Sequence, residues 1–409
     1  MVLTFRQENA DGCARRFATV TLPRNKEVIA DAWIEFVGEP GLPLPANLDG
    51  LVIFVLFFCM TRGGRLLVEG PMSASMLRSL RHFQQAWTRL KPKRCRFVEI
   101  VPASFADAPP ADDRAIAAFS GGIDSTFLAL QHTSDDLGPA RYPLTDLMFV
   151  HGLDIPLEQS EAFAKAMERS REFVESTSLR LRTVRTNVRK LDIPSWEAVH
   201  GAVIGGLLHQ FSHEFSLGMI ASTNTYENLR LDLGSSPIVD PLLGSKSFSI
   251  VHDGAAYRRV DKVRRVAANP LATKSARVCW QGSNWSRNCG VCDKCVQTQL
   301  DFLAVGKPNP ECFDRPLDLR LIKKISPTSP TRLRGYEYLL EVSKDRQTEP
   351  GVWRCRSGFA SCASSAATRP CETVWPIFWD RTDEVSQSLR RMNSGERQPG
   401  DVRSNGQNP

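Results

Sequence analysis

The sequence lacks an apolar run long enough to cross a membrane. Its longest run, Leu51–Met60, has ten residues, whereas a spanning helix needs about twenty. The start of the chain also lacks a basic segment followed by an apolar core and a small-residue cleavage site, the pattern of an export signal. We therefore expect a cytoplasmic protein with no membrane partner. Leu51–Phe58 is rich in β-branched and aromatic residues, which predicts a buried strand.

Neither a disulfide framework nor a strongly basic surface is indicated. Eleven cysteines in 409 residues, without an export signal, favour reduced thiols and a metal site. The 52 Lys and Arg residues against 45 Asp and Glu residues leave a net charge of +7. This excess suits phosphate-rich ligands, but no basic segment interleaved with aromatic residues stands out. Nucleic acid is therefore not an expected partner.

Length and changes of composition predict several domains. An Ala/Pro/Asp-rich linker at 106–113 follows an N-terminal part with strand-like stretches at 18–22 and 32–36. That part also contains an amphipathic helix, which follows Ser73 and has apolar residues at helical spacing as far as Leu90. The predicted divisions are an N-terminal α+β module at 1–112, an α/β domain at 113–278, a cysteine loop with C-terminal helices at 279–345, and a disordered tail at 346–409.

Strand-like and helix-like segments alternate after the linker, which predicts an α/β fold with a doubly wound parallel sheet. The expected strands lie at 115–119, 147–150, 179–184 and 217–221. In such a sheet, ligands bind beyond the carboxyl ends of the strands. This rule points to the loop after Phe119, to the end of the Val150 strand and to the segment after Ala221.

The loop Ser120–Ser125, with the sequence Ser-Gly-Gly-Ile-Asp-Ser, has the composition of a phosphate-binding turn. Two adjacent glycines allow strained backbone angles, so that successive amides can point at one anion. The following helix adds its free N–H groups and the positive end of its dipole. Asp124 can hold Mg²⁺ and Ser125 can bond a phosphate oxygen, which makes these two the candidate catalytic residues. The candidate ATP-binding residues are Ser120, Gly121, Gly122, Ile123, Asp124, Ser125, Thr126, Val150 and His151.

This loop differs from a nucleotide-kinase loop, because it lacks the lysine of the G-x-x-x-x-G-K-[ST] pattern. The alternative is an ordinary strand, turn and helix with a Gly-Gly turn. Ser120, Asp124 and Ser125 in register favour an ATP site. Backbone groups at the end of the Val150 strand are expected to read the adenine base. The role of His151 stays open between a catalyst and a local hydrogen-bond partner.

Two histidines on a predicted helix have a spacing that metal ligands also use. His209 and His213 are four residues apart, so they face the same side of the helix. The glutamate of the H-E-x-x-H pattern is missing, which favours packing or surface hydrogen bonds over metal binding.

Four cysteines cluster near residue 290. Cys279 is followed by Cys289, Cys292 and Cys295, the last three spaced C-x-x-C-x-x-C. Four thiolates on one short loop can close a tetrahedral site that leaves no position for water, which indicates a structural metal. Unligated thiols and an iron-sulfur cluster are the alternatives. Zn²⁺ is favoured, because no other redox feature lies nearby.

The Ser120–Ser125 loop resembles the signature loop of the ATP pyrophosphatase, or PP-loop, superfamily, and the cysteines extend the resemblance to 7-cyano-7-deazaguanine synthase of queuosine biosynthesis. The similarity runs from about Ala115 to Leu303 and includes the helix at 261–269. It implies an adenine nucleotide α-hydrolase-like fold in which the loop binds ATP and Mg²⁺ and the cysteines bind zinc. It also implies that a carboxylate is activated as an acyl-AMP, which ammonia or an amine attacks to form a C–N bond. AMP and pyrophosphate leave, and a second activation dehydrates the amide to a nitrile.

Several expectations follow for partners. They are ATP, a small carboxylate such as a deazaguanine, and a second copy of the chain in a homodimer. Within the segment that matches the deazaguanine-binding stretch, Asn224 is the candidate substrate-binding residue. The resemblance also covers branches with extra domains in bacterial anti-phage gene clusters, where a partner protein is the substrate. Two further functions stay open at this point: a tRNA-modifying PP-loop enzyme, and a nucleotide-sensing scaffold without turnover.

Overall fold

The computed structural model describes residues 1–109, 111–279, 281, 285–318 and 321, with the isolated positions 335, 338, 339 and 342. The chain divides into two compact units, Met1–Leu317 and Asp318–Pro409. Every strand and helix whose bounds are given below lies in the first unit. The predicted tail at 346–409 and most of the predicted helices that precede it lie outside the described residues.

Ten strands form one sheet, which is mostly parallel. The strands are β1 (Val2–Ala10), β2 (Cys13–Thr21), β3 (Val28–Val37), β4 (Gly64–Met72), β5 (Val98–Phe105), β6 (Ala115–Phe119), β7 (Leu144–His151), β8 (Arg180–Thr186), β9 (Leu217–Ala221) and β10 (Ser249–Asp253). Their order across the sheet is β10-β9-β6-β7-β8-β3-β2-β1-β4-β5. Pairing is antiparallel only between β8, β3, β2 and β1. The predicted α/β class is therefore confirmed.

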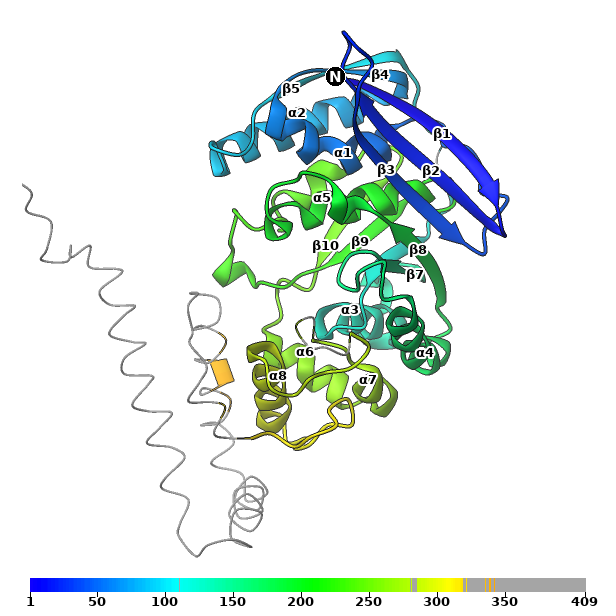
Figure 1. Ribbon diagram of the computed structural model, residues 1–409. Coiled ribbons are helices and arrows are strands. Elements are labelled where there is room, and N and C mark those ends of the chain that lie inside the picture. Colours follow the sequence, from blue (N-terminus) through cyan, green and yellow to red (C-terminus); the bar gives the residue numbers. More distant parts are fainter. Residues whose placement is uncertain are drawn as a thin grey trace, which may run out of the picture. The chain divides into compact units, whose positions relative to one another are not determined.

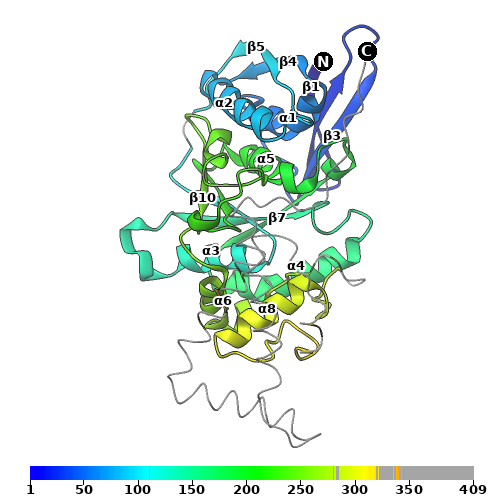
Figure 2. The same cartoon turned by 90° about the vertical axis from the view of Figure 1, so that its left-hand side faces the viewer.

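Helices cover the sheet on both faces. They are α1 (Asp49–Arg62), α2 (Ala74–Leu90), α3 (Ile123–Thr133), α4 (Ser160–Ser176), α5 (Trp196–Leu208), α6 (Arg259–Ala267), α7 (Pro270–Ser275) and α8 (Asp293–Ala304). The described residues also form five short 3-10 helices: η1 (Asp135–Ala140), η2 (Val188–Lys190), η3 (His209–Phe211), η4 (Tyr226–Asn228) and η5 (Asp240–Leu243). Figures 1 and 2 show α1, α2 and α5 on one face of the sheet and α3, α4, α6 and α8 on the other. Each face has its own apolar cluster.

The parallel half of the sheet has a reversal point. Counted along the chain from β6, the order β8-β7-β6-β9-β10 is 3-2-1-4-5. The chain leaves β6 and β7 through α3 and α4 on one face, and it leaves β8 through α5 on the other face. Strand order therefore reverses between β6 and β9, and the crevice at such a point is where doubly wound sheets bind ligands.

The sheet continues across the predicted domain boundary at residue 112. Strand β3 pairs with β8 from Ile34 opposite Thr186 to Val37 opposite Thr183. On the helical face, α1 packs closely on α5. A Cβ added at Gly206 would lie 3.0 Å from the Cα of Phe54, so glycine permits this approach. The residues before 112 thus share both a sheet and a core with the residues after it.

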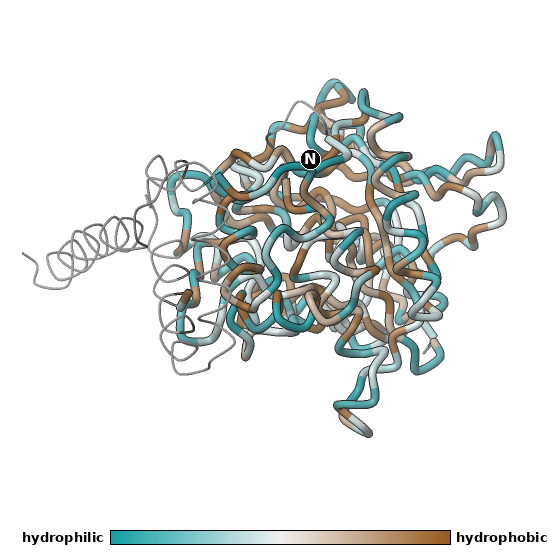
Figure 3. Tube along the Cα trace, turned by 90° about the horizontal axis from the view of Figure 1, so that it is seen from below, coloured by the Kyte–Doolittle hydropathy of each residue, from teal (hydrophilic) through white to brown (hydrophobic). Residues whose placement is uncertain are grey.

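The apolar segment Leu51–Phe58 is a helix, and the prediction of a strand was wrong. It lies within α1, where no residue from Leu51 to Met60 is more than 3% exposed. A helix buried on all sides shows no alternation of apolar and polar residues, so its sequence cannot be distinguished from a buried strand by periodicity. Figure 3 shows that hydrophobic residues concentrate inside the fold and that hydrophilic residues lie mostly at its edges. No helix within the described ranges is long and apolar enough for a membrane crossing.

Other predicted elements are confirmed. Strands β6 and β9 have the predicted bounds, 115–119 and 217–221. Helix α2 begins after Ser73, whose side chain accepts a hydrogen bond from the backbone N–H of Met76. This N-cap satisfies one of the free N–H groups of the first turn. Strands β1, β4, β5 and β10 were not predicted.

Stability is expected to fall in mild acid because of His209. Its ring is buried, Nε2 donates to the carbonyl of Leu243 at 2.7 Å, and burial lowers the pKa to about 4. The unfolded chain binds a proton near pH 6.5, so stability is present above that pH and is lost progressively as the pH falls toward 4. Between pH 7 and pH 5 this histidine should cost about 2 kcal/mol of unfolding free energy. Urea titrations should show a flatter pH dependence for His209→Gln, which keeps a donor, than for the wild type. The exposed control His82→Gln should match the wild type, and an unchanged slope in His209→Gln would contradict this assignment.

Candidate functional site

The Ser120–Ser125 loop connects β6 to α3 in a compact turn. Gly121 has a φ of +72°, a conformation that side-chain-bearing residues rarely adopt, and Gly122 is the N-cap of α3. The Ser125 hydroxyl donates to the Gly122 carbonyl at 3.2 Å and accepts from the Ser120 N–H at 3.3 Å. The turn is therefore closed by its own hydroxyl groups at the N-terminus of a helix, where the first N–H groups have no intrahelical acceptor.

Two cations from α6 hold the carboxylate of Asp124. Lys262 Nζ lies 3.1 Å from Asp124 Oδ1, although the lysine side chain is only 1% exposed. The same ammonium donates to the Ser222 carbonyl at the end of β9. Arg259 Nη1 lies 3.6 Å from the other carboxylate oxygen. Burial alone would raise the pKa of Asp124, but Lys262 and Arg259 together lower it below its ordinary value.

Arg259 is fixed in turn by α8. Its Nε donates to Asp301 at 3.0 Å and its Nη2 donates to Thr298 at 2.9 Å. Asp301 is 1% exposed, and burial raises the pKa of this carboxyl to about 7 in spite of the arginine. The position of Arg259 beside the loop therefore depends on where α8 lies.

Arg277 crosses directly over the loop. Its backbone N–H donates to the Gly121 carbonyl at 2.8 Å, and its Nη2 donates to the Ser120 carbonyl at 3.4 Å. Nη2 also lies 3.8 Å from Asp154, in the loop after β7. The buried Nε has no hydrogen-bond partner in the described part of the chain. Burial lowers the pKa of Arg277, as expected for a cation whose counter-ion is distant.

A fourth cation, Lys294, interacts electrostatically with Asp124, Asp154, Arg259 and Arg277. It stands at the start of α8. Arg259, Lys262 and Arg277 thus contact the loop, and the exposed Lys294 adds a fourth positive charge near it. Sequence reasoning missed all four, because they are more than 130 residues away from Asp124 along the chain. No local pattern marks which surface of α6 or α8 faces the loop.

The four predicted cysteines come together as one group. The Sγ atoms of Cys279, Cys289, Cys292 and Cys295 all lie within 4.8 Å of one another. Two of the separations, Cys279 to Cys292 and Cys289 to Cys295, are 3.9 and 3.8 Å. A tetrahedron with zinc–sulfur bonds of about 2.3 Å has edges of about 3.8 Å. The cluster is therefore close to the geometry of a four-thiolate site and could hold a metal ion such as zinc.

Asn288 organises the backbone around these cysteines. Its side-chain oxygen accepts from the N–H groups of Val278 and Cys279, at 2.8 and 3.1 Å. Its side-chain nitrogen donates to the carbonyls of Ala276 and Cys312, both at 2.9 Å. The residue is 4% exposed, so all four bonds are protected from water. The cysteine loop is thereby joined to the segment that carries Arg277.

The remaining predicted site residues lie close to the carboxyl ends of the strands. His151 is 2% exposed, its Nε2 bonds the Pro156 carbonyl at 2.9 Å, and its ring stacks on Phe163. Burial lowers the pKa of His151, which suits a neutral ring in the core. The ring is therefore a local hydrogen-bond partner, and the predicted contact with an adenine base would use only the backbone of Val150 and His151. Asn224 is 8% exposed and follows Ser222, whose carbonyl receives Lys262. His209 and His213 do not join the metal cluster.

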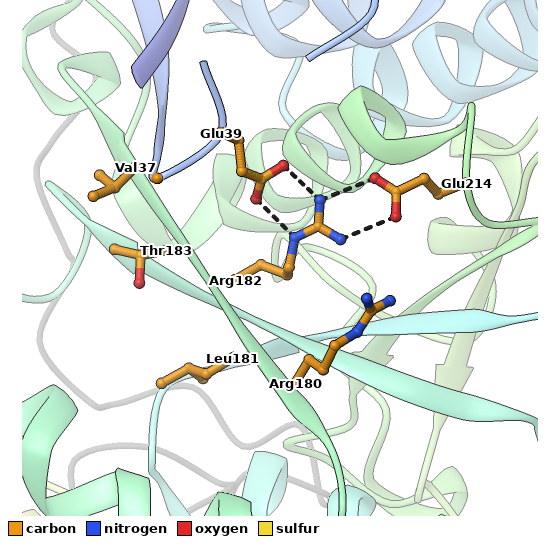
Figure 4. A pocket seen from close by; sticks show the side chains of 8 residues that line it. Val37, Glu39, Arg180, Leu181, Arg182, Thr183 and Glu214 are labelled. Carbon is orange, nitrogen blue, oxygen red and sulfur yellow. Dashed lines mark hydrogen bonds and ion pairs between the residues drawn. The ribbon is translucent and has the colours of Figure 1, made fainter. Parts of the chain in front are cut away.

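A polar hollow of about 370 Å³ lies elsewhere. Its lining includes Arg182 from the first half of β8, whereas the loop follows the last residue of β6, so the two lie at opposite ends of parallel strands. Figure 4 shows the Arg182 guanidinium between Glu39 and Glu214, at 2.7 and 2.9 Å. Burial alone would lower the pKa of Arg182, but the hydrogen bonds to these two carboxylates raise it above its ordinary value. The guanidinium therefore already has its hydrogen-bond partners. The hollow is the surface of an ion-pair network.

Comparison of the chain with protein-family models, with curated proteins and with solved structures found no match in any of the three. The interpretation of the site therefore depends on the residues and the geometry described above.

Removal of one cysteine should abolish metal binding. Cys295→Ser is expected to lower the metal content from about one ion per chain to nearly none, because a four-thiolate site needs every ligand. Elemental analysis of the purified protein measures this directly. Cys312→Ser is the matched control, since Cys312 is a buried thiol outside the cluster. Full metal content in Cys295→Ser, or equal loss in both variants, would contradict the assignment.

The conformation of Gly121 can be tested against that of Gly12. Both have a φ of +72°, and a Cβ at either position meets nothing closer than 3.4 Å. Alanine at either position should cost a similar backbone strain of about 1 kcal/mol. The predicted phosphate-binding role of the Ser120–Ser125 turn implies that only Gly121→Ala weakens binding of ATP, by at least about tenfold. Calorimetric titration with Mg²⁺ and ATP measures the affinity. Equal affinities for the two variants would show that the loop is not part of the predicted ATP site.

Proposed function

We propose that this protein is an ATP-dependent ligase that activates a carboxylate as an acyl-AMP, similar to 7-cyano-7-deazaguanine synthase. The observation that carries the proposal is the surrounding of the Ser120–Ser125 turn by Arg259, Lys262, Arg277 and Lys294. The turn follows β6 at the point where strand order reverses. Backbone amides, a helix N-terminus and several cations at such a point favour a polyphosphate ligand.

The chemistry assigns a separate task to each group. A carboxylate oxygen attacks the α-phosphorus of ATP, the bond to the β-phosphate breaks, and pyrophosphate leaves. Charge accumulates on the leaving pyrophosphate, where the loop amides and Lys262 stabilise it. Ser120 and Ser125 keep the loop in shape, since their hydroxyl and amide groups bond each other. Arg277 stands over Gly121, where it can neutralise the same anion.

Asp124 fits a role in Mg²⁺ binding. Mg²⁺ prefers one or two carboxylates together with phosphate oxygens. In the structure Asp124 faces Lys262 and Arg259, and its lowered pKa keeps it ionised. Bound Mg²⁺ would supply neutralising charge to the phosphates; with Asp124 engaged by the metal, Lys262 and Arg259 would be free to contact the phosphates.

Zinc would serve the structure rather than the reaction. Four thiolates fill a tetrahedral site, so no coordination position is left for substrate. The cysteine loop includes Cys279, two residues after Arg277, and Cys295, in the first turn of α8. A metal ion there would hold Arg277 and, through α8, Arg259 beside the loop.

The acceptor of the acyl group is ammonia or an amine, and an amine on a partner protein would follow the same chemistry. A tRNA-modifying role has less support. On the open face of the N-terminal sheet, Arg15 and Arg185 both pair with Glu35. Glu35 offsets one of these two positive charges, whereas an RNA surface needs several free cations.

The proposal is tested by the products formed from ATP. Incubation with Mg²⁺, 7-carboxy-7-deazaguanine and ammonium should release AMP and pyrophosphate, which chromatography separates from ADP. Lys262→Met should lower the rate by at least about a hundredfold, as the loss of a transition-state contact does. Lys274→Met is the control, because Lys274 is exposed and pairs with Glu172 away from the loop. ADP as the only product would overturn the proposal that ATP is used for adenylation. Equal rates for Lys262→Met and Lys274→Met would show that Lys262 has no role in that reaction.

A further inference from the structure

His252 stands at the carboxyl end of β10, on the same edge of the sheet as the loop. It lies opposite Ile220 of β9. Two residues after Ile220, the backbone carbonyl of Ser222 accepts a hydrogen bond from Lys262. Ile220 and Ile250 belong to the cluster under α5, so His252 points to the α5 face. The lateral distance from β10 to β6 is two strand spacings, about 10 Å. An acyl group attached to AMP at the loop can span that distance.

A buried carboxylate fixes the ring of His252. Nδ1 lies 2.7 Å from Asp240 Oδ2, and Asp240 is 0% exposed. Asp240 also accepts from the Ser235 hydroxyl at 2.6 Å and from the Ser236 N–H at 3.2 Å, so its own position is rigid. A carboxylate on Nδ1 places the proton there and leaves the lone pair on Nε2.

The hydrogen bonds of the His252 ring among the described residues are all made by Nδ1, which leaves Nε2 unbonded on a side chain that is 3% exposed. The other groups nearby connect it to the loop. His200 of α5 interacts electrostatically with both Asp240 and Asp154. Asp154 in turn lies 3.8 Å from Arg277, which crosses the Ser120–Ser125 turn. His252 and the turn therefore border the same region beyond the strand ends.

The geometry points to His252 as the proton acceptor in the second half of the reaction, the attack of ammonia or an amine on the acyl-AMP. This inference depends on the proposed function. The nitrogen lone pair forms the C–N bond, the C–O bond to AMP breaks, and AMP leaves with the electron pair. The nitrogen must lose a proton, which moves to Nε2 of His252, while Asp240 stabilises the imidazolium that forms.

A second His–Asp pair, which joins α3 to the same strand, provides the control. His132 Nε2 lies 3.0 Å from the carboxylate of Asp253, which follows His252 in the chain. Its Nδ1 accepts from the Tyr142 N–H at 3.2 Å, so neither ring nitrogen is available to a substrate. Asp253 points to the opposite face, toward α3. Loss of this pair should disturb β10 without affecting proton transfer.

The experiment separates the two half-reactions with the full chain. Exchange of labelled pyrophosphate into ATP, with 7-carboxy-7-deazaguanine and without ammonium, reports adenylation alone. Amide formation with ammonium reports both steps. His252→Asn keeps a donor for Asp240 but removes the base, so exchange should stay within about twofold while amide formation falls by about a hundredfold or more. His132→Asn should leave the ratio of the two rates unchanged.

Each outcome decides between the claims. A fall in exchange equal to the fall in amide formation for His252→Asn would assign His252 a merely structural role. Wild-type rates of amide formation in His252→Asn would overturn the inference alone and leave the adenylation proposal standing. No exchange in the wild type would overturn the proposed function and this inference with it.

Discussion

The site depends on the burial of one lysine beside one carboxylate. Lys262 is 1% exposed, and a charge in that position is tolerated only with a partner, since removing the partner of a buried ion pair costs about 3–5 kcal/mol. Asp124 is that partner, and it stands in the first turn of α3. The pair therefore fixes α6 against the start of α3. Because Arg259 of α6 is bonded to Asp301, the same pair also fixes α8. Three helices are held around a turn of six residues.

The residues before 112 belong to the same structure as the half of the sheet that carries the Ser120–Ser125 turn. Arg182 on β8 bonds both Glu39, which follows β3, and Glu214, which precedes β9. On the other side, Lys91 at the end of α2 bonds Asp232 at 2.8 Å, in the segment after β9. That segment also contains Asn224 and leads to Asp240. The first hundred residues thus support the side of the site opposite the cysteine loop, a position in which they can shape what binds beside the nucleotide.

What the sequence predicted well was determined by local spacing. The Ser120–Ser125 turn was recognisable because strand, glycines and helix follow one another within fifteen residues. The cysteine cluster was recognisable because three of its four ligands lie within seven residues. The cations were not, since the fold alone brings Lys262 and Arg277 to a loop far away in the chain. For the same reason the pairing of His252 with Asp240 has no sequence signature. The prediction of a strand at Leu51–Phe58 failed for another reason. A uniformly buried segment has no periodicity from which its conformation can be inferred.

The arrangement of charges explains how such a site can exist before its ligand arrives. Bare cations in a partly buried position would be costly, and here the carboxylates of Asp124, Asp154 and Asp301 neutralise them. Each carboxylate contacts its cation through oxygen atoms, as a phosphate would. Under the proposed function, a triphosphate with Mg²⁺ would enter by exchange: Asp124 would bind the metal, and Lys262 and Arg259 would turn to the phosphates. Little reorganisation would be needed at Lys262 and Arg277, because these two cations are already in place and already buried. Preorganisation of this kind needs α6 and α8 to be rigid, and the cysteine cluster at the start of α8 is the feature that can make them so.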